Sequence, residues 1–267
     1  MKKTEKRVWY NHKWTVVVFV VLRVLVVLTG VLSALRQDYE SVFIAAVTFF
    51  LLLLPSIISR KLRIELPGTL EIILLVFIFA STILGEINKF YVRVPHWDTV
   101  LHTINGFCFA AIGFALVDML NRHERVSLRL SPLFLAITAF CFSMTIGVLW
   151  EFFECAMDQF FRADMQKDFI LRAFTSVTLD PDGAGNKVRV ADITRTVIQT
   201  ASGRDYVIEG GYLDVGLLDT MKDLFVNFIG AAVFSVIGYF YALRGDDRSK
   251  RRSIARDLML TPKDDGQ

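Results

Sequence analysis

Residues 133–153 read LFLAITAFCFSMTIGVLWEFF, an apolar run that holds one charged residue, Glu151. A helix needs about 20 consecutive, predominantly apolar residues to cross the hydrocarbon core of a bilayer. Runs of the same kind occur at residues 14–35, 41–58, 69–84, 100–120 and 221–243, of which 69–84 is the shortest. The sequence therefore predicts an all-α integral membrane protein with about six transmembrane helices.

The overall composition supports a membrane protein. Of 267 residues, 54% are hydrophobic and 23 are Phe, whereas a soluble domain contains about 45–50% apolar residues. This excludes intrinsic disorder and an ordinary cytosolic enzyme, and three Cys residues are too few for a disulfide scaffold. The 30 basic and 27 acidic residues leave a net charge of +3, which is too small to indicate a nucleic-acid partner.

The distribution of Lys and Arg predicts the orientation of the helices. Basic residues concentrate before the first run, at 60–63, at 122–129 and after the last run, and the positive-inside rule puts such segments in the cytoplasm. Both termini are therefore predicted to be cytoplasmic. The predicted organisation is a cytoplasmic N-terminus (1–13), transmembrane helices one to five (14–158), an extracytoplasmic loop (159–218), helix six (219–243) and a basic cytoplasmic tail (244–267).

The loop between helices five and six is the only sizeable soluble part. Residues 187–193 alternate polar and apolar side chains, as a half-buried strand does, and 196–200 and 206–209 resemble further short strands. The turn residues at 180–186 superficially resemble a calcium-binding loop, but Ala184 stands at the fifth position and no Glu closes the loop. We therefore expect a plain turn and a small extracytoplasmic β-hairpin insertion.

Polar residues recur at helical spacing at the predicted outer ends of helices four, five and six. Residues three or four positions apart lie on one face of a helix, so each helix presents one polar stripe. The three stripes are Asp98 with His102; Glu151, Glu154 and Asp158; and Asp219, Asp223 and Asn227.

Such a group of acids requires neutralisation. An ionisable side chain at the centre of a membrane helix costs about 2.5–3.5 kcal/mol, and less near the interface. Converging carboxylates also repel one another unless cations or protons neutralise them. Oxygen and nitrogen ligands suit a divalent cation such as Zn²⁺, Mn²⁺ or Mg²⁺. The predicted metal ligands are His102, Glu151, Glu154, Asp158, Asp219 and Asp223.

Catalytic roles follow from the same stripes. Glu151 and Glu154 are predicted catalytic carboxylates, one of them a general base, and Asp98 is predicted to orient His102. A proton relay or a cationic substrate remains an alternative to a metal. Asp98 and Asp219 stand at helix starts, where a carboxylate also serves as a simple cap.

Three other polar residues are further candidates for the site. Glu86 ends the third run on the predicted outer side, and Asn227 extends the stripe on helix six. Arg23 lies near the middle of the first run. It is expected to meet a lipid phosphate or one of the carboxylates, or else to snorkel to an interface.

Three motifs resemble the YjdF-like family of uncharacterised bacterial inner-membrane proteins and, more distantly, VanZ-like proteins. They are Trp97-Asp98 with His102 and Gly106; Gly147-Val148-Leu149-Trp150-Glu151-Phe152-Phe153-Glu154 with Asp158; and Asp219-Thr220-Met221-Lys222-Asp223-Leu224 with Asn227, Gly230 and Ala231. The resemblance implies a bacterial inner (plasma) membrane location. It implies no activity, although VanZ-like proteins are associated with the cell envelope and glycopeptide resistance. The long loop departs from the family pattern.

Three functions remain open from the sequence. The first is a divalent-cation-dependent hydrolase or transferase that acts on a lipid headgroup or envelope precursor, with membrane lipid as partner. The second is a non-catalytic structural or regulatory envelope protein. The third is a cation- or proton-coupled carrier, against which stands the position of the acids at one membrane face and not at the midplane.

Overall fold

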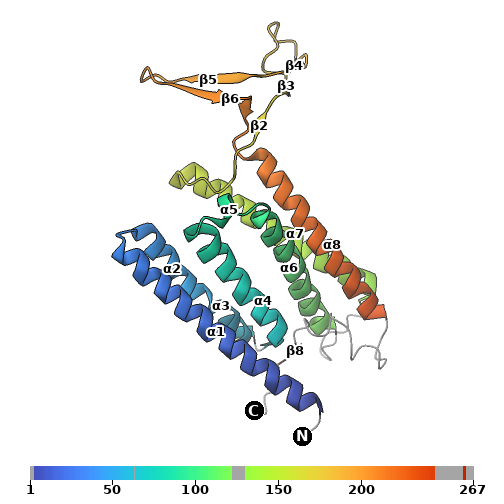
Figure 1. Cartoon of the computed structure of the whole chain (residues 1–267). Helices are drawn as coiled ribbons and strands as arrows, with labels where there is room; N and C mark the ends of the chain where they lie inside the picture. The colour runs from blue at the N-terminus through green and yellow to red at the C-terminus, as the bar shows by residue number, and fades with distance from the viewer. Residues whose placement is uncertain (1–2, 63, 122–129, 244–260, 263–267) are drawn as a thin grey trace. The chain divides into compact units, whose positions relative to one another are not determined.

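Six helices are long and apolar enough to cross a membrane. The computed structural model describes residues 3–62, 64–121, 130–243 and 261–262. The six candidate spans are Lys13–Leu35, Tyr39–Lys61, Gly68–Ile87, Trp97–Asn121, Pro132–Phe161 and Leu217–Leu243 (Figure 1). The predicted all-α membrane fold is confirmed, including the shortest run, while the orientation of the termini stays a prediction.

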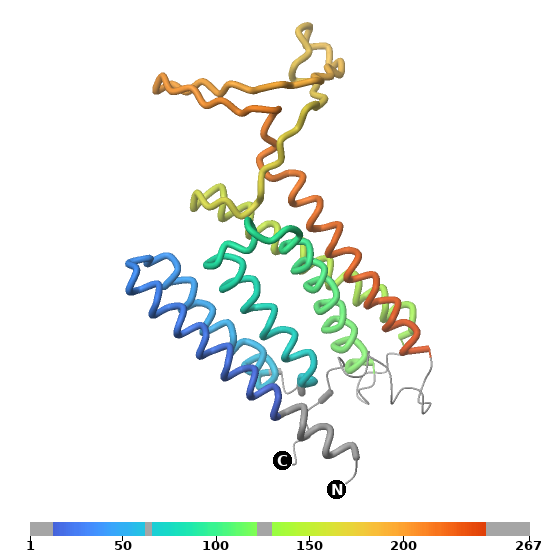
Figure 2. Tube along the Cα trace, viewed as in Figure 1, coloured from blue at the N-terminus to red at the C-terminus, as the bar shows by residue number. Residues whose placement is uncertain are grey.

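The first half of the chain supplies the first three spans. Helix α1 (Lys3–Leu35) is continuous, whereas the second span consists of α2 (Tyr39–Leu51) and α3 (Leu54–Leu62). The break lies next to Pro55 because proline has no N–H to donate to the carbonyl of Leu51. In the third span, α4 (Gly68–Phe79) continues into η1 (Ala80–Ile87), a π-helix. Figure 2 shows α1 and α2 running side by side.

The later spans are longer than the apolar runs predicted. After the short helix α5 (Phe90–Arg93), α6 spans Trp97–Asn121, α7 spans Pro132–Phe161 and α8 spans Leu217–Leu243. Helix α7 continues through Glu151, Glu154 and Asp158 and ends at Phe161. The acids therefore belong to helices and not to loops.

The chain forms two compact units. The first comprises Met1–Val148 and Leu224–Gln267 and contains two apolar clusters. In one cluster, Phe114 of α6 and Phe234 of α8 are fully buried with rings 6.2 Å apart. In the other, Leu22 and Val26 of α1 join buried residues of α2, α4 and η1. Within the described residues, this unit also holds the two-residue strands β1 (Ile64–Glu65) and β8 (Thr261–Pro262), which pair antiparallel.

The second unit, Leu149–Asp223, carries the predicted β insertion. It contains three antiparallel pairs, of which the first encloses the other two along the chain: β2 (Ile170–Leu171) with β7 (Tyr212–Leu213), β3 (Phe174–Ser176) with β4 (Val188–Val190), and β5 (Arg195–Gln199) with β6 (Asp205–Glu209). The predicted hairpin is β5–β6. Residues 180–186 form a turn in which the Asp180 carboxylate accepts the N–H of Asn186 at 2.8 Å. The strands from Ile170 to Leu213 are here called the cap.

Candidate functional site

The first turns of α6 place an acid and an imidazole on one helix face. Asp98 and His102 are four residues apart, and the Nε2 of His102 lies 3.4 Å from the Oδ1 of Asp98. The His102 side chain is 11% exposed and that of Asp98 is 26% exposed. Asp98 therefore lies beside a largely buried histidine on one helix face, as the spacing of four residues predicts. Its role in orienting the His102 ring stays a prediction.

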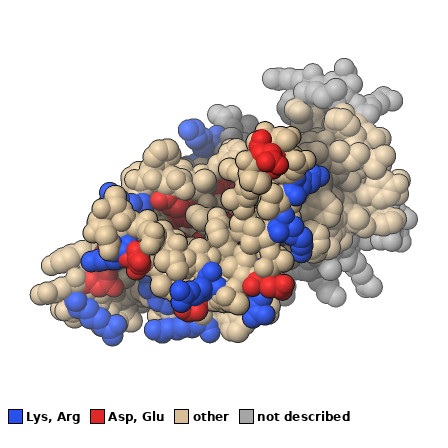
Figure 3. Space-filling model, turned by 90° about the horizontal axis from the view of Figure 1, so that it is seen from above, with Lys and Arg blue, Asp and Glu red and all other residues tan. Residues whose placement is uncertain are grey.

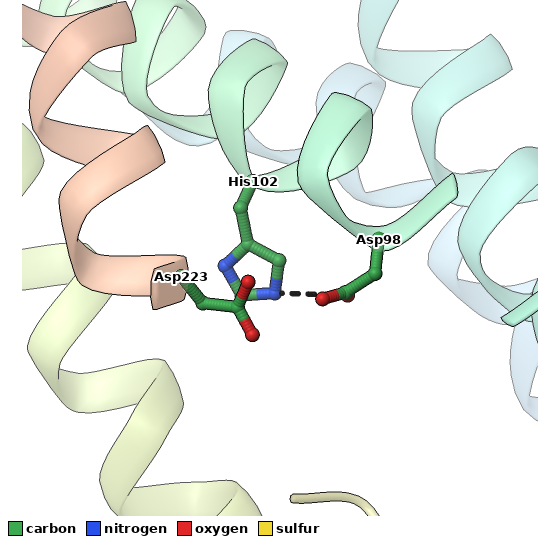
Figure 4. A group of neighbouring side chains, drawn as sticks. All are labelled: Asp98, His102 and Asp223. Atoms are coloured by element: carbon green, nitrogen blue, oxygen red, sulfur yellow. Dashed lines mark ion pairs between the residues drawn. The ribbon is translucent and has the colours of Figure 1, made fainter. Parts of the chain in front are cut away.

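Asp223 of α8 completes a group of three. One ligand atom from each of Asp98, His102 and Asp223 lies within 4.8 Å of the other two. The Asp223 side chain is 1% exposed. Figure 4 shows the three side chains converging from the two helices, with the ion pair between His102 and Asp98 drawn as a dashed line. Two carboxylates and one imidazole are a ligand set that divalent cations accept.

The backbones of α6 and α8 touch one helical turn beyond this group. A Cβ atom on Gly106 would lie 2.8 Å from the carbonyl carbon of Asn227, and one on Gly230 would lie 2.9 Å from the backbone nitrogen of Phe107. Gly106 follows His102 by four residues, and Asn227 follows Asp223 by four. Because a helix turns once in 3.6 residues, this backbone contact holds His102 and Asp223 opposite each other.

Asn227 lies where α6, α7 and α8 meet. Its side chain is 1% exposed. Its Oδ1 accepts a hydrogen bond from Asn105 of α6 at 3.0 Å, and its Nδ2 lies 3.6 Å from the sulfur of Met144 of α7. Ser143 of α7 also donates to the carbonyl of Gly106 at 2.7 Å. Asn227, predicted as a further site residue, therefore fastens the helices that carry the site.

Glu151 and Glu154 lie on α7, outside the group of three. Both are buried, with 4% and 8% of their surface exposed. The Oε1 of Glu154 accepts a hydrogen bond from the indole N–H of Trp150 at 2.8 Å. Their metal and catalytic roles stay predictions.

Asp158 and Asp219 hold the segment that follows α7. Asp158 accepts the backbone N–H groups of Met165 and Gln166 at 2.7 and 2.9 Å. Asp219 accepts the N–H of Lys167 at 2.9 Å. Both carboxylates thus bind backbone N–H groups of the segment that follows α7. The Asp219 bond goes to Lys167 and not to an amide of its own helix, so it is not the simple helix cap that the position of Asp219 suggested. The metal roles of Asp158 and Asp219 stay predictions.

Lys222 is a residue that the sequence reasoning missed. Its Nζ lies 3.0 Å from the Oδ1 of Asp219 and 3.4 Å from the Oδ1 of Asp223. It also lies 5.9 Å from the centre of the Phe169 ring. The spacing of three residues between Asp219 and Lys222 on one helix could have predicted this ion pair. Lys222 places a positive charge next to one member of the group of three.

Arg23 and Glu86 lie elsewhere in the first unit. The Arg23 guanidinium stacks on the rings of Phe49 and Phe19, at 3.9 and 4.8 Å from their centres, and donates to the carbonyl of Phe49 at 3.5 Å. Cation–π contact thus accounts for a charge in the middle of a span, an arrangement that none of the sequence alternatives included. Glu86 lies in the π-helix η1 and is outside the group of three.

Asp214 fastens the return of the chain from the cap to α8. Its carboxylate accepts the N–H groups of Phe169, Leu218 and Gly216 at 2.7, 2.9 and 3.2 Å. Burial raises the pKa of Asp214, but these donated hydrogen bonds outweigh burial and lower the pKa below its ordinary value. For Asp168, burial and the nearby Asp164, Asp214 and Asp158 carboxylates raise the pKa.

The structure predicts that acid loosens this connection. Because its folded-state pKa is lowered, Asp214 stabilises the fold above its unfolded-state pKa, and that stabilisation is lost as pH falls through the folded-state pKa. The folded-state pKa of Asp168 is raised instead, so the ionisation of Asp168 opposes folding at neutral pH. We expect Asp214→Asn to speed hydrogen exchange at the Phe169 and Leu218 amides about 10-fold at pH 7, since hydrogen bonds to charged groups contribute about 1.5–3 kcal/mol when buried and less here.

The same substitution should abolish most of the loss of protection (the intrinsic exchange rate divided by the observed rate) that the wild-type protein shows at these amides on acidification towards pH 3. Asp182→Asn is the matched control because Asp182 is an exposed aspartate in the 180–186 turn. Equal acid sensitivity of wild type and Asp214→Asn would contradict the assignment.

Surface charge gives no further site on the face shown in Figure 3. Lys and Arg side chains are interspersed there with Asp and Glu, and neither sign forms a continuous field. A mixed surface of this kind is ordinary for a protein face in water. The group on α6 and α8 is therefore the strongest candidate site in the described residues.

Comparison with known proteins bears on the family. Neither the curated proteins nor the solved structures contained a significant match. A match to the family described as "Predicted membrane protein (DUF2238)" covers residues 15–244. This range contains five of the six candidate spans completely and all but the first two residues of the span Lys13–Leu35. The match agrees with the YjdF-like resemblance of the three motifs. The chain belongs to this family of predicted membrane proteins.

Proposed function

We propose that this membrane protein binds a divalent cation through Asp98, His102 and Asp223, and that the cation supports hydrolysis or group transfer on a lipid headgroup or envelope precursor. The observation that carries the proposal is the approach of the three ligand atoms to within 4.8 Å of one another. Following the distribution of Lys and Arg, we place the site on the extracytoplasmic side of a bacterial inner membrane.

The separation of the ligand atoms suits a metal ion. Tetrahedral Zn²⁺ holds oxygen and nitrogen ligands at about 2.0–2.2 Å, which places them about 3.4 Å apart, and octahedral Mg²⁺ places neighbouring ligands about 3.0 Å and opposite ligands about 4.2 Å apart. The three ligand atoms lie within 4.8 Å of one another. Binding therefore requires them to approach by at most about 2 Å, which we expect side-chain rotation to supply.

The number of protein ligands is typical of a catalytic metal site. Three protein ligands leave coordination positions for water or substrate, which is typical of catalytic and not of structural sites. A cation so bound lowers the pKa of coordinated water and polarises a phosphoryl or carbonyl oxygen. In this chain, Glu151 or Glu154 of α7 is proposed to accept the proton from the attacking group.

The test is the metal content of the purified full-length protein in detergent or nanodiscs. We expect about one Zn²⁺, Mn²⁺ or Mg²⁺ per chain after dialysis against a mixture of the three ions. Both His102→Ala and Asp223→Asn should reduce retention at least 10-fold, because each removes one of three ligands.

Asp118→Asn is the matched control. Asp118 is a half-buried aspartate on the same helix as Asp98 but outside the group of three. Retention of the cation by His102→Ala or Asp223→Asn, or absence of a stoichiometric cation from the folded wild type, would overturn the proposal. Thermal unfolding of each variant shows whether a loss of metal reflects loss of the fold.

A non-catalytic structural role is the second candidate, favoured by the ion pairs of Lys222 with Asp219 and Asp223. Here the ammonium group, and not a metal, is the counterion. Lys222→Met separates the two functions. A dication about 5 Å from the ammonium is repelled by about 1–2 kcal/mol even at the dielectric constant of water, so the metal hypothesis predicts roughly 10-fold tighter cation binding. The structural hypothesis predicts lower thermal stability and no cation binding.

A further inference from the structure

The β5–β6 hairpin exposes apolar side chains on both faces. Val197 and Val207 face each other across the ribbon and are 40% and 52% exposed, while Ile198 and Tyr206 form the next pair and are 46% and 50% exposed. Successive residues of a strand point to opposite faces, so these two pairs lie on opposite sides. An isolated two-stranded hairpin is marginally stable in water, and three or more strands are needed for independent stability.

The outer edge of β5 is available for pairing. Within the hairpin, the N–H of Gly210 donates to the carbonyl of Thr194 at 2.7 Å, and the N–H of Thr200 donates to the carbonyl of Arg204 at 3.1 Å. In an antiparallel ladder every second residue bonds inward. Arg195, Val197 and Gln199 therefore direct their N–H and C=O groups outward, and within Leu149–Asp223 β6 is the one strand hydrogen-bonded to β5.

The outer edges of β5 and β6 carry different charges. These charges determine which of the two strands can pair with the same strand of a second chain. Antiparallel pairing of β6 with a second β6 about Val207 would set Asp205 opposite Glu209 twice, and like charges directly opposite destabilise a strand pair. Pairing of β5 with a second β5 about Val197 sets Arg195 opposite Gln199 twice, with no like charges opposed. Natural sheets protect edges with charge, so β6 is protected and β5 is open.

We propose that two copies of this chain associate through β5, antiparallel and centred on Val197. The two hairpins then form one four-stranded sheet in the order β6–β5–β5–β6. This arrangement satisfies the outward backbone groups of Arg195, Val197 and Gln199 and reaches the strand number that a stable sheet requires. It is closed by a two-fold axis, the commonest symmetry of homo-oligomers. The proposal is independent of the metal site.

The test is disulfide cross-linking of the full-length protein in native membranes. Cys108, Cys141 and Cys155 are free thiols and are first replaced by Ala. In the proposed dimer Val197 faces its own copy with the Cα atoms about 5.5 Å apart, within the range that a disulfide spans. We expect Val197→Cys to give a cross-linked homodimer on mild oxidation. Val207→Cys, three strand spacings or about 14 Å from its copy, should give none.

A second variant tests the dimer without a thiol. Val197→Arg sets two like charges opposite each other at the two-fold axis, and its exposed position lets the hairpin itself accept the change. We expect the dimer fraction measured by light scattering in detergent to fall at least 10-fold, with unchanged thermal unfolding. A monomeric wild type, a dimer that survives Val197→Arg, cross-linking of Val207→Cys, or cross-linking of Val197→Cys to a different protein would each overturn the proposal.

Discussion

Gly106→Ala is expected to abolish cation binding and to destabilise the protein by at least about 3 kcal/mol. The new methyl group would lie 2.8 Å from the carbonyl carbon and 3.0 Å from the Cα of Asn227. Overpacking against a side chain costs about 1–3 kcal/mol because the neighbour moves aside. Here the neighbour is the backbone of α8, so the helices must separate, and the ligands His102 and Asp223 separate with them.

The experiment measures thermal unfolding by tryptophan fluorescence and cation retention on the same samples. Gly230→Ala should behave alike, because its Cβ would meet the backbone of α6 at Thr103 and Phe107. Gly30→Ala is the matched control, since its Cβ would make a 3.4 Å contact with the Cβ of Ala45 and would improve helix propensity. Wild-type stability of Gly106→Ala would refute the backbone contact of α6 and α8.

Asn227→Ala is expected to lower the free energy of unfolding by about 2–4 kcal/mol. The substitution leaves the Asn105 amide without its acceptor, which costs about 1–3 kcal/mol. It also opens a void beside Gly147, whose Cβ position lies 2.7 Å from the Asn227 Nδ2. Since the junction of three helices loosens, cation affinity should fall as well.

A double-mutant cycle with Asn105→Ala isolates the hydrogen bond from the void. Side-chain hydrogen bonds between membrane helices contribute about 0.6 kcal/mol on average and up to about 1.7 kcal/mol. We expect a coupling energy in that range from unfolding in mixed detergent micelles. Thr145→Ala serves as the control on α7, because Thr145 is exposed and donates within its own helix to Cys141. Additive effects of Asn105→Ala and Asn227→Ala would show that the two amides do not interact.

The local features of the fold were predictable from the sequence because they depend on neighbouring residues. Each span requires a long apolar run, and each run is visible in the chain. The pairing of Asp98 with His102 follows from a spacing of four residues on one helix. The β5–β6 hairpin follows from alternation and turn residues. Pro55 could also have predicted the break between α2 and α3, but it lies inside a continuous apolar run that is typical of one uninterrupted helix.

The site itself was only partly predictable. Eight polar residues on three helices had the right spacing, and the structure brings three of them, Asp98, His102 and Asp223, within reach of one ion. Spacing along a helix fixes the face on which a side chain lies, but not how that helix is rotated toward its neighbours. The backbone donors of Met165, Gln166 and Lys167 that engage Asp158 and Asp219 come from a segment with no periodic pattern.

The amino-acid sequence alone was enough to predict six helices long and apolar enough to cross a membrane, a β insertion before the last, and acids near the ends of three of them. Hydrophobic burial and helical periodicity are local, so the chain displays them directly. Which acid of another helix lies near His102 was known only from the three-dimensional packing, because it depends on the contact of α6 and α8 at Gly106 and Asn227. Two positions that are far apart in sequence come together through close packing, for which a single sequence carries no signal.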